Sequence, residues 1–94
     1  MDIGEIKHKG LQRLYDDDDA RQLPAAAVRK IKRILAALAF ADDLSQVQTI
    51  PGWRLHPLKG KRRGVYSITV TGNWRLTFRV EGQAITELNF EDYH

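Results

Sequence analysis

The order of apolar and polar positions changes near the middle of the chain. Before residue 43 the apolar residues recur with a period near 3.6, which is typical of amphipathic helices. After that point they alternate with a period of two, which is typical of strands with one buried face. We therefore expect an α+β fold, in which two N-terminal helices pack on one face of a twisted antiparallel sheet.

Two helices are predicted in the first half. A weak alternation over residues 3–8 is compatible with a short strand, and Leu11 and Leu14 then predict a helix that ends near Asp16. The four aspartates at residues 16–19 predict a solvated loop, because the helix dipole disfavours acids in a last turn. Pro24 suits the first turn of a second helix, whose apolar residues recur at i, i+3/4 and i+7. These are Ala27, Val28, Ile31, Ile34, Leu35 and Leu38.

Four alternating runs predict strands in the second half, and the turn sequences TGN and EGQ between the last three predict an antiparallel meander. In the clearest run Trp74, Leu76 and Phe78 face one side, and Asn73, Arg75, Thr77 and Arg79 face the other. In the last run strict alternation sets Leu88 and Phe90 opposite Ile85, Glu87 and Glu91. The predicted strands are residues 53–58, 65–70, 73–80 and 84–92.

Composition narrows the class of protein. A chain of 94 residues that is 43% hydrophobic suits one domain over residues 1–94. The absence of cysteine excludes a disulfide framework and a thiolate metal site. No apolar run approaches the roughly 20 residues that span a bilayer, and the first residues lack the apolar stretch of a signal peptide. We expect a soluble, cytoplasmic protein without a membrane partner.

The basic residues of the second half form an uninterrupted positive stretch, because no Asp or Glu occurs between residues 54 and 80. By strand parity Arg75 and Arg79 lie on the open sheet face, on the side of Arg54 and His56. Such a face suits a phosphodiester backbone, although a merely solvated face remains the alternative. The basic residues are Arg54, Lys59, Lys61, Arg62, Arg63, Arg75 and Arg79.

Proton-transfer groups cluster at the end of the chain. RNA cleavage without a metal needs a base for the 2′-OH, an acid for the leaving 5′-oxygen, and cations against the charge that develops on phosphorus. The titratable groups near the basic stretch are His56, Asp92, Tyr93 and His94, and parity does not choose among them. The histidines show no metal-ligand spacing, so we expect neither a metal nor another cofactor.

Three stretches resemble the HigB-type host-inhibition toxins, a branch of the RelE/ParE superfamily in bacterial type II toxin–antitoxin systems. They are KHKGLQRLY, WRLHPLKGKRRGVYSITVTGNWRLTF and the terminal EDYH. The resemblance implies a fold like that of microbial ribonucleases, and a ribosome-dependent mRNA interferase that cleaves mRNA in the A site and inhibits translation and growth. It also implies neutralisation by a HigA-type helix-turn-helix antitoxin, with operator DNA bound only through the antitoxin complex.

The resemblance also implies roles for single residues. His56 and Lys59 match the family motif in HPLKG, Arg75 matches NWR, and Asp92, Tyr93 and His94 match the terminal acid, aromatic and imidazole. Lys59 and Arg75 would stabilise the phosphate and the transition state. Acid–base work would fall to His56, Asp92, Tyr93 or His94. The residues expected to bind RNA or the ribosome are Arg54, Lys61, Arg62, Arg63, Asn73 and Arg79.

Two alternatives remain open from the sequence. Many members of the resembled family carry a basic residue at the strand position that Thr69 occupies, which predicts one phosphate contact fewer in this chain. This leaves room for a weakly or non-catalytic binding module that acts with its antitoxin as a DNA-binding autorepressor. A ribosome-independent ribonuclease of the barnase kind would need a glutamate base in the sheet, for which Glu87 and Glu91 are the candidates.

Overall fold

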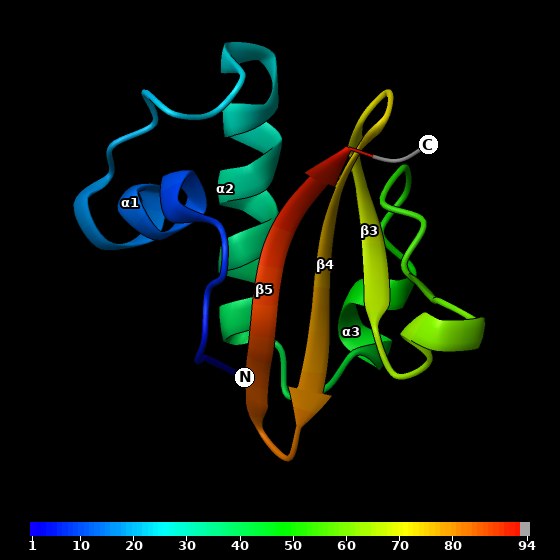
Figure 1. Ribbon diagram of the computed structural model, residues 1–94. Helices are drawn as coiled ribbons and strands as arrows, with labels where there is room; N and C mark the ends of the chain where they lie inside the picture. Colours follow the sequence, from blue (N-terminus) through cyan, green and yellow to red (C-terminus); the bar gives the residue numbers. More distant parts are fainter. Residues whose placement is uncertain (93–94) are drawn as a thin grey trace.

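The computed structural model describes residues 1–92, so Tyr93 and His94 lie outside the described part of the chain. Helices and strands follow one another in an α+β arrangement, as predicted, and the long helices lie on one side of the sheet (Figure 1). The elements are β1 (Asp2–Ile3), α1 (Lys9–Asp17), α2 (Ala25–Phe40), α3 (Ser45–Gln48), β2 (His56–Pro57), the short 3-10 helix η1 (Gly60–Arg62), β3 (Tyr66–Thr71), β4 (Trp74–Glu81) and β5 (Ala84–Asp92).

The five strands form one sheet in the order β1-β5-β4-β3-β2. The meander from β2 to β5 is antiparallel, as the turn signals predict. The edge strand β1 departs from this pattern because it runs parallel to β5, with Asp2 opposite Ala84 and Ile3 opposite Ile85. The predicted strand at residues 53–58 shrinks to two residues, because Arg54 adopts a positive φ of 51° that ends the extended conformation.

Helix α1 begins and ends with identifiable caps. The His8 side chain accepts a hydrogen bond from the Leu11 backbone N–H at 3.1 Å, and burial lowers the pKa of His8, which favours the neutral, accepting ring. At the other end Asp18 takes the left-handed conformation, with φ 54°. The predicted aspartate loop is therefore partly wrong, since Asp16 and Asp17 continue the helix. Asp18 pairs instead with Lys32 of α2 at 2.8 Å.

The core lies between α2 and the sheet. The apolar face predicted for α2 is buried, including Ile31, Ile34 and Leu38. It meets Leu76 and Phe78 of β4, which are also fully buried. The short helix α3, which the sequence pattern does not predict, adds Val47 to the same cluster. Burial of this apolar surface leaves the other face of the central strands for polar side chains.

A β-bulge in β5 corrects the strict alternation expected there. The pairing of β4 with β5 shifts register between Thr77 and Arg79, and Glu87 has a positive φ of 50°. One extra residue in a strand reverses the side-chain parity beyond it. Ile85 is therefore buried in the core together with Leu88, although alternation sets the two on opposite faces. The bulge thus changes which side chains of β5 reach the open face.

Candidate functional site

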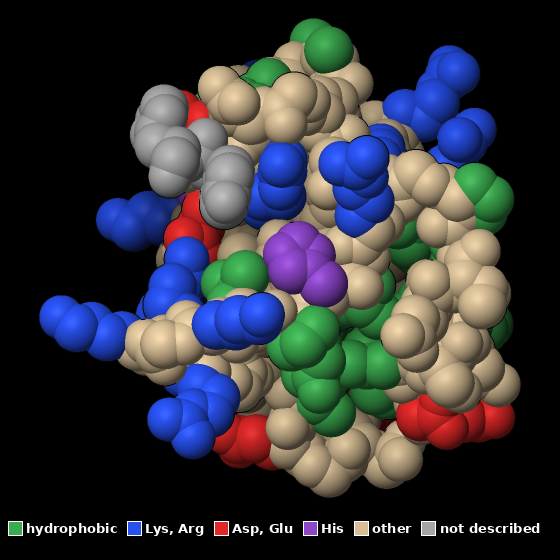
Figure 2. Space-filling view, turned by 90° about the vertical axis from the view of Figure 1, so that its right-hand side faces the viewer, with side chains coloured by type: hydrophobic (Ala, Val, Ile, Leu, Met, Phe, Trp, Pro, Cys, Tyr) green, Lys and Arg blue, Asp and Glu red, His purple; other side chains and the backbone are tan. Residues whose placement is uncertain are grey.

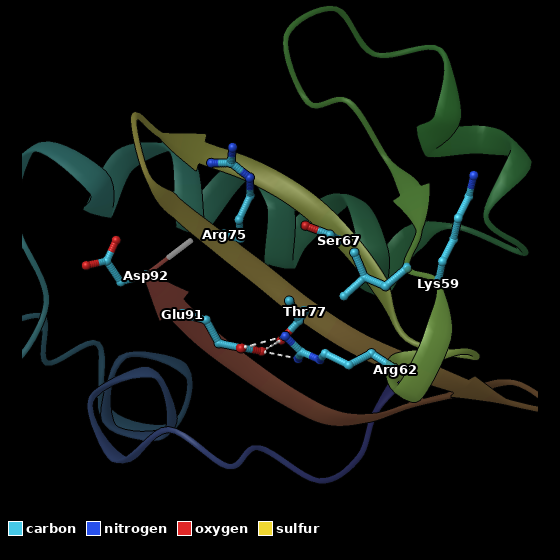
Figure 3. Close-up of a pocket in the computed structure, with 8 residues that line it drawn as sticks. Lys59, Arg62, Ser67, Arg75, Thr77, Glu91 and Asp92 are labelled. Atoms are coloured by element: carbon cyan, nitrogen blue, oxygen red, sulfur yellow. Dashed lines mark hydrogen bonds and ion pairs between the residues drawn. The ribbon is translucent and has the colours of Figure 1, made fainter. Parts of the chain in front are cut away.

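A cavity of about 370 Å³ lies on the sheet face that the helices leave open (Figure 3). Strands β3, β4 and β5 supply its floor, and the segment around η1 supplies one wall. Among the described residues that line it, three are cationic and most of the others are polar. The lining residues are Leu58, Lys59, Arg62, Ser67, Arg75, Thr77, Glu91 and Asp92.

Strand register explains why these polar side chains meet. Residues that pair across neighbouring antiparallel strands point to the same face. Ser67 pairs with Thr77, and Arg75 of β4 pairs with Glu91 of β5. On the opposite parity, Ile68 and Leu76 face the helices. The same alternation that builds the core therefore delivers a polar row to the cavity.

Arg75 is held in a defined orientation at the cavity. Its Nη1 donates hydrogen bonds to the carbonyl oxygens of Gly72, at 2.8 Å, and of Trp74, at 3.1 Å. Its charge also reaches α2, because the pKa of Lys30 is lowered by burial and, secondarily, by repulsion from Arg75. Lys30 in turn donates to the Gly52 carbonyl at 3.1 Å. The guanidinium is therefore anchored by the β3–β4 turn and lies in a positive field.

Arg62 and Glu91 form a bidentate ion pair across the cavity. Arg62 Nη1 donates to Glu91 Oε1 at 2.9 Å, and Nη2 donates to Oε2 at 2.6 Å. The Thr77 hydroxyl also donates to Glu91 Oε2. The hydrogen bonds from Arg62 lower the pKa of Glu91 against the opposing effect of burial, and Thr77 lowers it further. Glu91 is therefore an ionised acceptor whose two oxygens are both engaged, which makes it a weak base.

This pair predicts an acid-dependent loss of stability. A carboxyl whose pKa is depressed in the folded state stabilises the protein above its unfolded pKa, and that contribution is lost as pH falls through the folded pKa. For Glu91 the loss should begin below its ordinary value of 4.5. We expect Glu91→Gln to flatten the pH dependence of the free energy of unfolding in this acid range, measured by urea titration at a series of pH values. As a control, Glu5→Gln removes an exposed carboxylate, and a Glu91→Gln profile parallel to wild type would contradict the assignment.

The structure brings together some of the predicted catalytic residues and separates others. Lys59 lines the cavity with Arg75. Asp92 lies at its edge, where it pairs with Trp74 rather than with Arg75, and its carboxylate points away from the other labelled side chains (Figure 3). His56 is exposed in β2, opposite Ser67, and its Nδ1 lies 2.8 Å from the Arg54 carbonyl oxygen. It lines a separate hollow of about 240 Å³ beside α3 rather than the cavity itself. The remaining two candidates, Tyr93 and His94, lie outside the described residues.

The residues predicted to bind RNA spread more widely. Arg62 lines the cavity, and Arg79 lines a second cavity on the same face. The other four, Arg54, Lys61, Arg63 and Asn73, are exposed and line neither cavity. Figure 2 shows Lys and Arg side chains gathered around a histidine on the side of the molecule it displays, next to an apolar patch. A positive field therefore extends beyond the cavity.

Comparison with known proteins decides the family. A family model described as the RelE-like toxin of type II toxin–antitoxin system HigB matches residues 4–94. The chain belongs to this HigB-like toxin family. It is 42% identical over 93 residues to Endoribonuclease HigB of Proteus vulgaris, covering 98% of this chain and 99% of that protein. It is 35% identical over 83 residues to Toxin HigB-1 of Vibrio cholerae serotype O1, covering 86% and 87%.

The fold agrees with the HigB-like assignment. A crystal structure of a YafQ mutant from E. coli superposes with a TM-score of 0.60 at 15% identity, covering 98% of this chain and 93% of that one. At this identity the match shows a shared fold. As a member of a type II toxin–antitoxin family, the chain has an antitoxin as its partner.

Three polar residues of this HigB-like site were not assigned to it from the sequence. The sequence offered Glu91 as a possible base or as a cross-strand partner of Arg75, and it indicated no role for Ser67 and Thr77. Both hydroxyl residues are buried, at 2% and 4% exposure, although they lie on the open face of the sheet. The alternation could have indicated Thr77, because it follows Arg75 by two positions in β4 and therefore points to the same face of the sheet. What the sequence lacked was the pairing register, which sets Arg75 beside Glu91 rather than beside Glu87.

Neither a metal site nor a membrane span is found in the described part of the chain. Among residues 1–92, no group of three or more His, Asp or Glu side chains is placed to hold a metal ion. Within the same residues, no helix has both the length and the apolar content needed to cross a bilayer.

Proposed function

We propose that this chain is a ribosome-dependent mRNA interferase, an endoribonuclease that cleaves mRNA in the ribosomal A site by metal-independent attack of the 2′-OH. The observation that carries the proposal is the cavity on the open sheet face, which is lined by the three cations Lys59, Arg62 and Arg75. Its volume of about 370 Å³ lies in the range of small-ligand sites. The name of the Proteus vulgaris relative, Endoribonuclease HigB, supports the endoribonuclease part of this proposal.

The cations of the cavity would stabilise the reacting phosphate. Attack by the 2′-oxygen places additional negative charge on the phosphoryl oxygens, and cations already in position stabilise that charge without reorganisation. Arg75 suits this role because two backbone carbonyls fix its guanidinium before substrate arrives. Lys59 adds a point charge from the opposite wall of the cavity, at the beginning of η1 (Figure 3).

Proton transfer would fall to His56, Asp92, Tyr93 or His94. Asp92 ends β5 at the cavity, and Tyr93 and His94 follow it directly in the chain. His56 lies on β2, where it pairs with Ser67 of the neighbouring strand β3. Glu91 is the weaker candidate for a base, because Arg62 and Thr77 occupy its oxygens and lower its pKa. This disfavours the barnase-like alternative.

The same proposal implies the partners of the protein and its place in the cell. We infer a HigA-type helix-turn-helix antitoxin as the partner, with operator DNA bound only through the complex. The ribosome and its mRNA would be the target, which places the protein in the cytoplasm. The exposed Arg54, Lys61 and Arg63 would contact ribosomal or messenger RNA through phosphates, so binding should weaken steeply with salt.

One observation favours a second candidate, a weakly catalytic module that acts through its antitoxin complex. Thr69 pairs with Arg75 across β3 and β4, so a neutral side chain lies directly beside the arginine proposed to bind the reacting phosphate. A cation there would add to the stabilisation of the transition state. The two candidates differ in how much cleavage the chain catalyses, and the same experiment tests both.

The test is a cleavage assay of one defined mRNA, with the purified chain alone and then with programmed ribosomes, mapping new ends by primer extension. New ends at A-site codons that require ribosomes are the expected result. Cleavage of the naked RNA would support the barnase-like ribonuclease instead. No cleavage in either reaction, by a protein shown to be folded by circular dichroism, would contradict the interferase and favour the binding module.

A further inference from the structure

A second cavity of about 240 Å³ lies beside the first on the open face of the sheet. Three residues, Arg62, Thr77 and Glu91, line both cavities. The ion pair of Arg62 and Glu91 therefore forms the wall between them, and we call this pair the partition. On its far side the second cavity presents two further cations, Lys7 and Arg79.

Breaking the ion pair of the partition should cost little free energy. Its side chains retain 49% exposure for Arg62 and 26% for Glu91, and Arg62 belongs to the short η1 segment rather than to a long element. Exposed ion pairs contribute only about 0–1 kcal/mol, because water and salt screen them. A phosphodiester presents the same pair of acceptor oxygens to a guanidinium as a carboxylate does. A phosphate can therefore replace Glu91 as the partner of Arg62.

The cations of the second cavity contact a carboxylate and a backbone carbonyl. Glu87 Oε2 lies 3.0 Å from Arg79 Nε, and Glu87 Oε1 lies 3.5 Å from Lys7 Nζ. Arg79 also donates to the Arg63 carbonyl at 3.3 Å. Glu87 has the positive φ of the β5 bulge, a conformation that non-glycine residues adopt rarely. Bulges commonly aim a side chain at a functional site, and this one sets a carboxylate between two cations.

We propose that the second cavity binds a backbone phosphate of single-stranded RNA next to the scissile one, and that Arg62 leaves Glu91 for the RNA as it binds. Opening the partition joins the two cavities into one groove along the sheet, from Arg75 to Arg79. Glu91 then acts as an internal anion that occupies Arg62 until a phosphate replaces it. This inference rests on the proposed function, because it takes RNA as the ligand.

The test measures binding and does not depend on cleavage. A 2′-O-methyl RNA oligonucleotide lacks the attacking hydroxyl, so its affinity for the intact chain can be measured by fluorescence anisotropy over a salt series. Each phosphate contact on a single strand contributes about 0.7 to the slope of log K against log salt. Arg79→Ala should therefore make the slope shallower by about 0.7. Arg33→Ala, which removes an exposed arginine of α2, is the matched control and should leave the slope unchanged.

Glu91→Gln tests the partition itself. Removing the competing carboxylate should tighten binding about threefold, the size expected from one exposed ion pair. Weaker or unchanged binding by Glu91→Gln would overturn the role of the partition. An Arg79→Ala slope equal to that of Arg33→Ala would overturn the second phosphate site. If Arg79→Ala fails to fold, the exposed Lys7→Ala variant gives the same readout for the same cavity.

The results also separate this inference from the proposed function. If the wild type cleaves mRNA on ribosomes but Arg79→Ala leaves the salt slope unchanged, the second phosphate site is refuted and the interferase is supported. The expected changes of slope and affinity without cleavage would refute the interferase and leave an RNA-binding groove. No binding of the oligonucleotide to wild type at low salt would refute the groove directly.

Discussion

Arg75→Ala is expected to lower the rate of mRNA cleavage on programmed ribosomes about 100- to 1000-fold, which is the usual cost of removing one preorganised transition-state stabiliser. Arg75 lines the cavity, and the carbonyls of Gly72 and Trp74 fix its orientation. The negative charge that develops on the phosphoryl oxygens would lose this cation. The measurement is a single-turnover rate from primer extension, accompanied by growth after expression without antitoxin.

Two further variants give this experiment its controls. Arg33→Ala removes one positive charge from the exposed surface of α2 and should leave cleavage unchanged. Arg75→Lys keeps the charge but loses the planar fork, so an intermediate rate is expected. The fold should survive in Arg75→Ala, because the side chain is only partly buried and lies on the polar face. Full cleavage by a folded Arg75→Ala protein would contradict the assignment.

Phe78→Ala is expected to lower the free energy of unfolding by about 3–5 kcal/mol, the usual cost of emptying a buried aromatic site. Phe78 has no exposed surface, and its ring stacks on Tyr66 with a centroid separation of 6.0 Å. It lies in the central strand β4, where the sheet meets the helices. Small domains have a total stability of only about 5–15 kcal/mol, so this loss approaches global unfolding. Urea titration followed by circular dichroism measures it.

The matched control for this variant is Phe40→Ala. Phe40 ends α2 with 89% of its surface exposed, so its removal should change stability by less than about 0.5 kcal/mol. The two substitutions delete the same side chain from opposite environments. A loss below about 1 kcal/mol for Phe78→Ala would mean that the core does not close around β4 as described.

The sequence by itself determined the elements whose signal is local. The apolar period of α2 and the alternation of β3 and β4 are set by side chains within a few positions of one another, so periodicity alone assigned them and the open face of Arg75. The motifs HPLKG, NWR and the terminal DYH indicated the toxin family, which the family match confirms. They also selected Lys59, Arg75 and Asp92, which line one cavity; their catalytic roles stay a prediction.

Only the tertiary structure decided the features that depend on register between distant segments. Three such features have no local periodicity from which they could be predicted. They are the parallel pairing of β1 with β5, the bulge at Glu87 and the short helix α3. The contact of Arg62 with Glu91 requires the η1 segment to fold over the sheet, which is set by loop conformation and long-range pairing. Periodicity assigns a side chain to a face, and only pairing between strands and loops determines which side chains on that face meet.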